Sequence, residues 1–329
     1  MSGLFSRRGM LAAAGAFAMA PAFAASASAA DYPSRPVTLV VAFTPGGPSD
    51  VLARIVGKKM GDILGQTFVI ENRPGAGGNI AAEYVSHAAP DGYMLLMGNN
   101  SILATNEALY KSLKYKPEAF EPITLVGTQA NILVVNPKVP AHSLKELIAL
   151  CKSEPGKINF ASSGHGAAAH LAGELFKTEA KVDIVHVPYK GAAPALQDVI
   201  AGNDQMMFAT AASVIGHIKG GQVRALAVTT LKRTTLLPDV PTMDEAGLPG
   251  FEASTWHGLV APAGTPRELI AKLHDAAVKA LNDPTVHASL EKLGVDVIGD
   301  TPQEFAAYIK AEIPKWTAIV KASGASMSQ

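Results

Sequence analysis

Residues 37–54 have the sequence VTLVVAFTPGGPSDVLAR and predict a strand, a glycine turn and a helix in close succession. The apolar, β-branched run at residues 37–43 is typical of a strand buried on both faces. Pro48 suits the first helical position, and Asp50 suits the helix dipole and can accept from a free backbone N–H. A helix that begins directly after a buried strand aims its free N–H groups at the sheet edge. Such groups bind anions without a cationic side chain.

The composition indicates a globular, turn-rich protein with enough chain for two domains. Its 329 residues include 30 Gly and 22 Pro, and 28 Lys and Arg balance 28 Asp and Glu. The absence of a basic excess argues against nucleic acid as a partner. The single cysteine, Cys151, lies in an apolar helical pattern, so we expect a buried small hydrophobe and not a nucleophile.

Residues 1–30 are typical of an export signal and are excluded from the predicted fold. A twin arginine, Arg7 and Arg8, precedes an uncharged alanine-rich run, and residues 28–30 supply small side chains for cleavage near Ala30. The pattern resembles a twin-arginine (Tat) signal, and a plain secretory signal is the alternative. Both predict a periplasmic protein. No later segment reaches membrane-spanning length without a charge.

Strand and helix patterns alternate along the rest of the chain. Strands are predicted at residues 67–71, 93–97, 157–161, 183–187, 206–209 and 225–229, and helices at 80–88, 143–152, 167–177, 192–201, 265–281, 286–293 and 302–320. Ser143 and Thr265 each precede a Glu by three residues, so we expect both to be helix N-caps. Long extended stretches at residues 123–136 and 251–261 bracket the middle of the chain.

The simplest topology is an α/β protein of two lobes, with the chain crossing twice between them. The expected divisions are an export signal at residues 1–30, lobe 1 at residues 31–128 with 256–329, and lobe 2 at residues 129–255. In such proteins a ligand binds between the lobes, at the carboxyl ends of the strands.

A second strand, glycine turn and helix occur at residues 157–177, with the turn SSGHG at residues 162–166. The two helix starts would face each other across the cleft and hold one carboxylate between them. Thr44, Ser162 and Ser163 add hydroxyls, and Asn99 and Ser101 follow a third strand. The alternative is that such turns merely connect strands to helices.

Other patterns leave further interpretations open. The GxGxxA match at residues 164–169 has the form of a dinucleotide fingerprint, with Glu179 or Asp183 as a ribose-binding acid. His170 and Glu174 are spaced to share a metal, but no third ligand is visible, so packing or capping is favoured. The aromatic side chains of Phe43, Tyr189 and Trp256 would wall a pocket or pack at the hinge.

Segments spread over the whole mature chain resemble the Bug-type extracytoplasmic solute receptors of tripartite tricarboxylate transporters. They include VIENRPGAGGNIAAEYVSHAAPDGYMLLMGNN, NFASSGHGAAAHLAGELFK, VPYKGAAPALQDVIAG and LLPDVPTMDEAGLPGFEASTWHGLVAPAGTP. The resemblance implies a type II periplasmic-binding-protein fold that closes like a Venus flytrap. It also implies a carboxylate ligand held by two loops, at residues 43–50 and 162–170, and the large and small membrane subunits of a transporter as partners.

The chain departs from the family pattern where specificity is set. Ala167 or Ala168 stands where a hydroxyl residue is common in the family, and Thr210 begins a helix start, TAA, where an acid or amide is common. The resemblance therefore implies a distal pocket that is less polar than in relatives that bind amino acids, and a less polar or aromatic carboxylate as ligand.

We expect a monomeric binding protein for a small organic carboxylate, without catalysis, cofactor or metal. An exported dinucleotide-dependent oxidoreductase and a sensory co-receptor are the alternatives. The predicted ligand-binding residues are Phe43, Thr44, Gly46, Gly47, Asp50, Asn99, Ser101, Ser162, Ser163, Gly164, His165, Gly166, Ala168, His170, Tyr189, Thr210 and Trp256.

Overall fold

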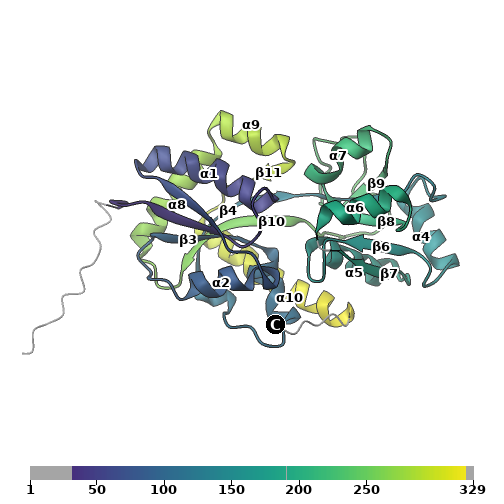
Figure 1. The fold of residues 1–329 in the computed structure, drawn as a ribbon, viewed down its shortest axis with the longest axis horizontal. Coiled ribbons are helices and arrows are strands. Elements are labelled where there is room, and N and C mark those ends of the chain that lie inside the picture. The colour runs from purple at the N-terminus through teal and green to yellow at the C-terminus, as the bar shows by residue number, and fades with distance from the viewer. Residues whose placement is uncertain (1–31, 190, 324–329) are drawn as a thin grey trace, which may run out of the picture.

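The computed structural model describes residues 32–189 and 191–323, which form two β-sheets with helices packed on both (Figure 1). The predicted export signal at residues 1–30 lies outside the described residues. Within the described part of the chain, no helix combines the length and apolar character needed to cross a membrane.

The first sheet has six strands and carries the opening strand of the chain near its edge. Its order is β11 (Val295–Val297), β4 (Phe120–Gln129), β10 (Thr255–Pro262), β3 (Met94–Asn99), β1 (Val37–Val41) and β2 (Phe68–Asn72). β1 is parallel to β2 and β3, whereas β10 is antiparallel to β3 and β4. The helices of this part are α1 (Pro48–Leu64), α2 (Asn79–Ser86), α3 (Asn106–Leu109), α8 (Arg267–Leu281) and α9 (Pro284–Lys292). Short helical turns lie at η1 (Ala76–Gly78), η2 (Ser101–Thr105) and η3 (Pro117–Ala119).

The second sheet has five strands. Its order is β7 (Val185–Pro188), β6 (Asn159–Ser162), β8 (Met206–Thr210), β5 (Asn131–Val135) and β9 (Arg224–Val228). Its helices are α4 (Leu144–Ser153), α5 (Ala168–Ala180), α6 (Ala192–Ala201) and α7 (Ala211–Lys219). β6 is parallel to β7 and β8, so the turn before α5 lies at the carboxyl end of a parallel strand, like the turn before α1.

The chain passes between the two sheets twice, as predicted. β4 ends at Gln129 and β5 begins at Asn131, so Ala130 alone separates a strand of one sheet from a strand of the other. The return passes into β10 at Thr255. The predicted extended stretch at residues 123–136 is therefore two strands, and the one at residues 251–261 becomes a strand only from Thr255.

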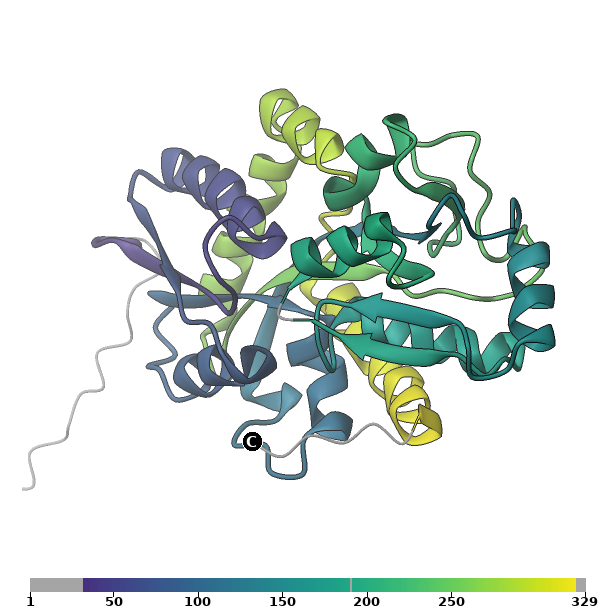
Figure 2. The same cartoon turned by 45° about the vertical axis from the view of Figure 1, so that its right-hand side comes forward.

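The last helix, α10 (Pro302–Ser323), packs against β4 and η2 and also against α5 beside the second sheet (Figure 2). Glu312 anchors it. The buried Glu312 carboxylate accepts from Nε1 of Trp256 at 2.9 Å and of Trp316 at 2.7 Å, and from Lys315 Nζ at 3.0 Å. A buried carboxylate with this many donors is well compensated for the loss of water.

Of the two predicted helix N-caps, one is confirmed and one is wrong. Ser143 caps α4 by accepting from the Glu146 N–H at 3.2 Å, as predicted. Thr265 does not cap α8, because Pro266 is the N-cap and the Thr265 hydroxyl donates to the Pro262 carbonyl at 2.7 Å instead. Cys151 is buried, as predicted, and burial raises the pKa of its thiol to about 11.

Two glycines inside helices should respond to alanine in opposite ways. In Gly173→Ala, the new Cβ in α5 would overlap the ring of Phe160, so we expect a loss of about 1–3 kcal/mol of unfolding free energy. In Gly216→Ala, the new Cβ in α7 meets nothing within 4 Å, so we expect a gain of about 0.5–1 kcal/mol. Urea unfolding of both variants measures this, and equal effects would contradict the packing of α5 on β6.

Candidate functional site

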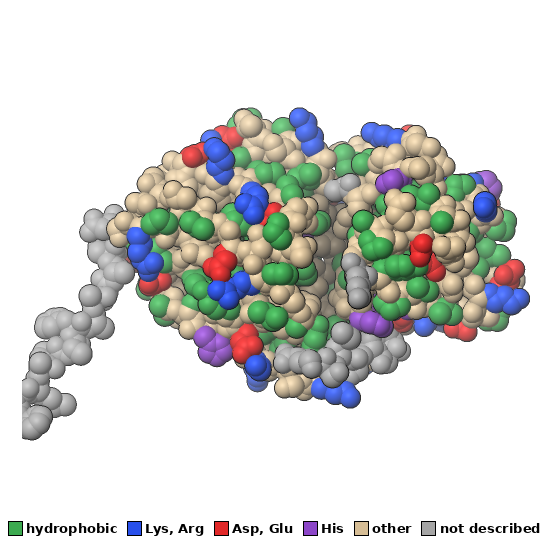
Figure 3. Space-filling view, viewed as in Figure 1, with side chains coloured by type: hydrophobic (Ala, Val, Ile, Leu, Met, Phe, Trp, Pro, Cys, Tyr) green, Lys and Arg blue, Asp and Glu red, His purple; other side chains and the backbone are tan. Residues whose placement is uncertain are grey.

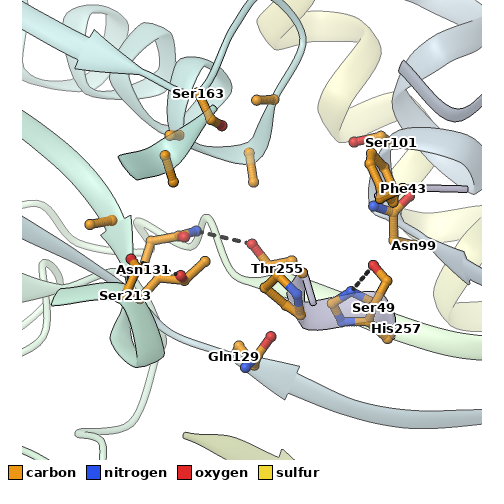
Figure 4. Close-up of a pocket in the computed structure, with 18 of the residues that line it drawn as sticks. Phe43, Ser49, Asn99, Ser101, Gln129, Asn131, Ser163, Ser213, Thr255 and His257 are labelled. Carbon is orange, nitrogen blue, oxygen red and sulfur yellow. Dashed lines mark hydrogen bonds between the residues drawn. The ribbon is translucent and has the colours of Figure 1, made fainter. Parts of the chain in front are cut away.

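A cavity of about 480 Å³ lies between the two sheets, where both passages of the chain meet (Figures 3 and 4). Its walls come from the starts of α1, α5, α6 and α7, from the ends of β3 and β8, and from β4, β5 and β10. The volume suits a small organic molecule.

The first wall is the turn before α1. Phe43, Thr44, Gly46 and Gly47 line the cavity together with Ser49 of the first helical turn. Gly46 has φ +83°, a conformation that favours glycine. Gly47 is the N-cap and offers no side-chain hydrogen bond, so the first free N–H groups of α1 have no protein side chain as partner.

Asp50 supports this turn from behind and does not line the cavity. Its carboxylate accepts from the Gly46 N–H, from Arg54 Nε and from Asn72 Nδ2, each at 2.9 Å. The Asn72 amide also donates to the Phe43 carbonyl at 2.9 Å. Burial opposes ionisation of Asp50, but the hydrogen bonds outweigh it and lower the pKa of the carboxyl below its ordinary value. Asp50 is a positioning residue in this arrangement.

The opposite wall is the turn before α5, from the second sheet. Ser163, Ala167, Ala168 and Ala169 line the cavity, and the N-cap Ala167 makes no side-chain hydrogen bond. Two further helix starts open onto the same space, α6 at Ala192 and α7 at Thr210 and Ser213. Several helix starts, each carrying roughly half a positive charge, thus converge on one volume.

The hinge strands form the remaining wall, and their side chains are polar. Gln129, Asn131, Thr255 and His257 line the cavity (Figure 4). His257 Nε2 and Ser49 Oγ are 2.8 Å apart, which joins β10 to the first turn of α1. Asn131 Nδ2 donates to the Ala253 carbonyl at 2.8 Å and to Thr255 Oγ1 at 3.4 Å.

The described lining contains no Asp, Glu, Lys or Arg side chain. Its one titratable side chain is His257, and burial lowers its pKa to about 4. The cavity is therefore uncharged at neutral pH, apart from the helix dipoles. A site of this kind favours an anion over a cation and makes no ion pair with either.

Nine of the predicted residues lie on the cavity wall: Phe43, Thr44, Gly46, Gly47, Asn99, Ser101, Ser163, Ala168 and Thr210. The other eight do not line it: Asp50, Ser162, Gly164, His165, Gly166, His170, Tyr189 and Trp256. Ser162 instead braces the second turn, because its Oγ accepts from the Gly164 N–H at 3.1 Å. Trp256 faces α10, and the Tyr189 hydroxyl lies 2.6 Å from Asp198 Oδ2 and 2.7 Å from Asp204 Oδ2.

Three histidines gather behind the second turn, with ligand atoms of His165, His170 and His186 all within 4.8 Å of one another. His170 and His186 are stacked, with ring centroids 4.0 Å apart and planes 20° from parallel. His170 Nδ1 accepts from the Gly166 N–H at 3.0 Å, and His186 Nε2 lies 2.6 Å from Ser162 Oγ. A metal lies in the plane of each imidazole that binds it, so two nearly parallel rings do not converge on one ion as they stand. The stack braces the turn by packing.

The turn that matches the dinucleotide fingerprint precedes a helix, but its glycines, Gly164 and Gly166, do not line the cavity. Gly166 is buried against Leu109, where a Cβ would overlap the leucine side chain. Glu179 and Asp183 are exposed and do not line the cavity. Neither acid is therefore placed to bind a ribose in this cavity.

Sequence reasoning missed Ser49, Gln129, Asn131, Ser213, Thr255 and His257. Thr255 and His257 stand two residues apart in an apolar stretch, which was the available signal for a shared polar face. Gln129 gave no comparable signal, because only the pairing of β4 with β10 brings it opposite Thr255.

Comparison with known proteins identifies the family. Residues 52–325 match the family described as tripartite tricarboxylate transporter family receptor. Protein BugT of Bordetella pertussis is 38% identical over 320 residues, which is 97% of this chain and 98% of that protein.

Solved structures are also similar over most of the chain. R. palustris Rpa4515 with adipate has a TM-score of 0.82 and 37% identity, over 91% of this chain and 100% of that one. MatC from Rhodopseudomonas palustris with bound malate has a TM-score of 0.78 and 36% identity, over 88% and 100%. The fold is that of the two-lobed periplasmic binding proteins. The chain belongs to the tripartite tricarboxylate transporter receptor family.

Proposed function

We propose that this protein is a periplasmic receptor that captures a small organic carboxylate between its two sheets and delivers it to a tripartite tricarboxylate-type transporter. One observation carries the proposal. Two helix starts without side-chain caps, α1 beside one sheet and α5 beside the other, line one cavity that has no charged side chain among its described residues.

The proposed clamp consists of backbone N–H groups. A carboxylate offers about four acceptor sites, and the first turns of both helices have donors without a partner in the helix, although Pro48 at the first position of α1 has no N–H and leaves those of Ser49 and Asp50. Ser49, Ser163 and Thr210 add hydroxyls around the same space. Binding satisfies donors on both sides at once, so the ligand favours the state in which the two sides are close.

The lining also bears on the class of ligand. No carboxylate is present among the described lining residues to pair with an ammonium group, which disfavours amino acids. Phe43, Met207, Phe208 and Leu293 supply apolar surface. Two relatives hold adipate and malate. We propose a carboxylate with a tail that carries no positive charge and is less polar than an amino acid.

Closure of the two lobes would be the signal that the membrane subunits of the transporter recognise. We propose that residues 31–128 with 256–329 form one lobe and residues 129–255 the other, since these divisions follow the membership of the two sheets to within one residue, Gln129 and Thr255 being the last and first residues of strands of the first sheet. The large and small membrane subunits would contact the closed form of a monomer. A sensory co-receptor would use the same closure with a different partner.

The clamp predicts that a carboxylate side chain at the start of α5 competes with the ligand. In Ala168→Asp we expect the affinity for adipate, malate or butyrate, whichever binds the wild type, to fall by about 100-fold. Stability should stay equal or rise by about 0.3–1 kcal/mol, since an acid suits a helix N-terminus. Calorimetric titration and thermal unfolding measure the two effects. Ala168→Asn is the matched neutral control, and wild-type affinity in Ala168→Asp would refute the clamp.

The uncharged lining predicts that affinity does not depend on pH near neutrality. His257, with a pKa of about 4, stays neutral, and the lowered pKa of Asp50 keeps it ionised. We expect the dissociation constant to vary by less than about twofold from about pH 6 to 8. A tenfold change across that range would contradict an uncharged site.

Stability, in contrast, should fall on acidification. The folded-state pKa of His257 is lowered from 6.5 to about 4, and those of His170 and His186 to about 4 and 3, chiefly by burial. Below pH 6.5 the unfolded chain takes up protons that the folded protein does not, so unfolding free energy should decrease from about pH 6.5 towards 4. Urea unfolding at a series of pH values measures it, and a constant unfolding free energy over this interval would contradict neutral buried histidines.

A further inference from the structure

The helix starts of α1 and α5 share one local design. In each, a glycine with positive φ precedes the N-cap, and a side chain four residues later accepts its backbone N–H. Gly46, with φ +83°, donates to Asp50 Oδ2 at 2.9 Å. Gly166, with φ +74°, donates to His170 Nδ1 at 3.0 Å. Asp50 and His170 are each the third residue of their helix, so they occupy equivalent positions.

The match continues one helical turn further, with a different arrangement of charge. Arg54, four residues after Asp50, donates from Nε to the Asp50 carboxylate at 2.9 Å. Glu174, four residues after His170, places Oε1 at 3.8 Å from His170 Nε2. Residues four apart lie on the same face of a helix, so each turn is supported by a column of side chains. The acceptor is an anion in the first column and an imidazole in the second.

The tautomer of His170 follows from its two contacts. Nδ1 accepts the Gly166 N–H, so the neutral ring carries its proton on Nε2, the atom that lies toward Glu174. Burial lowers the pKa of the ring to about 4, and His165 and Lys177 act in the same direction. At neutral pH, Nδ1 therefore keeps the lone pair that accepts the Gly166 N–H.

His186 supports the same ring by stacking. The two imidazole centroids are 4.0 Å apart, and His186 Nε2 lies 2.6 Å from Ser162 Oγ. The Ser162 hydroxyl in turn accepts the Gly164 N–H at 3.1 Å. The stacked pair thus fixes two glycine N–H groups of the turn, one directly through Nδ1 of His170 and the other through Nε2 of His186 by way of Ser162.

These contacts leave the alanine N–H groups for the cavity. The N–H groups of Gly164 and Gly166 are held by side chains, and the Ala167 N–H donates to the Gly164 carbonyl at 3.3 Å. Ala168 and Ala169 begin α5, so their N–H groups have no carbonyl partner within the helix, and both residues line the cavity. The side of the turn that faces a ligand is thus defined by what holds its other side.

We propose that His170 is a positioning residue of the binding site and has the role in the second helix start that Asp50 has in the first. By accepting the Gly166 N–H, His170 Nδ1 holds the turn in the shape that presents the Ala168 and Ala169 N–H groups to a bound carboxylate. This inference rests on the proposed function, because these N–H groups are one half of the proposed clamp.

The neighbour one turn further along α5 explains why the acceptor is a histidine. The Asp50 carboxylate is balanced by Arg54, whereas a carboxylate at residue 170 would face Glu174. Two like charges at positions i and i+4 destabilise a helix, and burial of a carboxylate beside another one opposes its ionisation. A neutral imidazole supplies the acceptor without adding a charge.

The test uses the different reach of asparagine and glutamine. An Asn amide lies near the position of Nδ1 of a histidine, whereas a Gln amide lies near that of Nε2. We expect His170→Asn to bind within about threefold of the wild type, and His170→Gln to bind at least about tenfold more weakly. Calorimetric titration with adipate, malate or butyrate, whichever binds the wild type, measures both affinities.

His186 provides the matched control, because it acts through the other nitrogen. His186→Gln should bind more tightly than His186→Asn by at least about threefold, since only the longer side chain reaches Ser162. A role in packing alone predicts that the larger Gln is better tolerated at both positions. The opposite order of Asn and Gln at residues 170 and 186 would therefore support positioning through hydrogen bonds.

Amide hydrogen exchange of Gly166 tests the turn in the ligand-free protein. Exchange should be at least about tenfold faster in His170→Gln than in the wild type, and close to the wild-type rate in His170→Asn. Equal affinities or equal exchange rates in the two His170 variants would overturn the proposal. If the wild type binds none of the acids, the proposed carboxylate function fails, and the exchange rates still decide whether His170 holds the turn.

Discussion

The alternation of side chains along β10 is the constraint on which the two halves of this protein depend. Thr255 and His257 face the cavity, whereas Trp256 and Gly258 face α10. On the α10 side, Trp256 donates to the Glu312 carboxylate, and Phe305 occupies the space that a Cβ on Gly258 would need. A shift of one residue in register would bury the site residues against α10 and turn the tryptophan into the cavity.

The proposed clamp needs helix starts that are left uncapped, which explains the arrangement around α1. Asp50 is the type of residue that usually satisfies N–H groups in a first turn, but here its carboxylate turns back to the Gly46 N–H, Arg54 and Asn72. The acid therefore holds the turn in shape while the cavity side of α1 stays free of negative charge. Gly47 and Ala167, the two N-caps, have no side chain that could take the place of a ligand.

Local sequence was sufficient for most of the elements, though not for β11, α3 or α7, and it placed nine of the seventeen predicted residues on the cavity wall. Strand, turn and helix at residues 37–54 follow from β-branched residues, glycine and Pro48, and the second turn repeats the pattern. It was not sufficient for the wall that the hinge strands form, because Thr255, Trp256 and His257 are consecutive residues of a strand covered on both faces. Which of them meets a ligand depends on pairing with β3 and β4, far apart in sequence. The same reason explains Gln129 and the misplaced expectation for Trp256.

The helix starts and the hinge strands contribute different parts of the cavity wall. Backbone N–H groups can donate to any carboxylate, and the alanines at 167 and 168 add no side-chain hydrogen bond that would distinguish one carboxylate from another. The described lining has no ionised side chain, so charge disfavours a ligand that also carries an ammonium group but does not distinguish among neutral tails. The rest of the lining, the polar side chains of the hinge strands and the apolar side chains of Phe43, Met207, Phe208 and Leu293, is what a ligand tail would contact. In the proposed receptor the helix starts hold the carboxylate and the hinge strands face the rest of the ligand, and the 2.8 Å contact between Ser49 Oγ and His257 Nε2 joins these two parts of the wall.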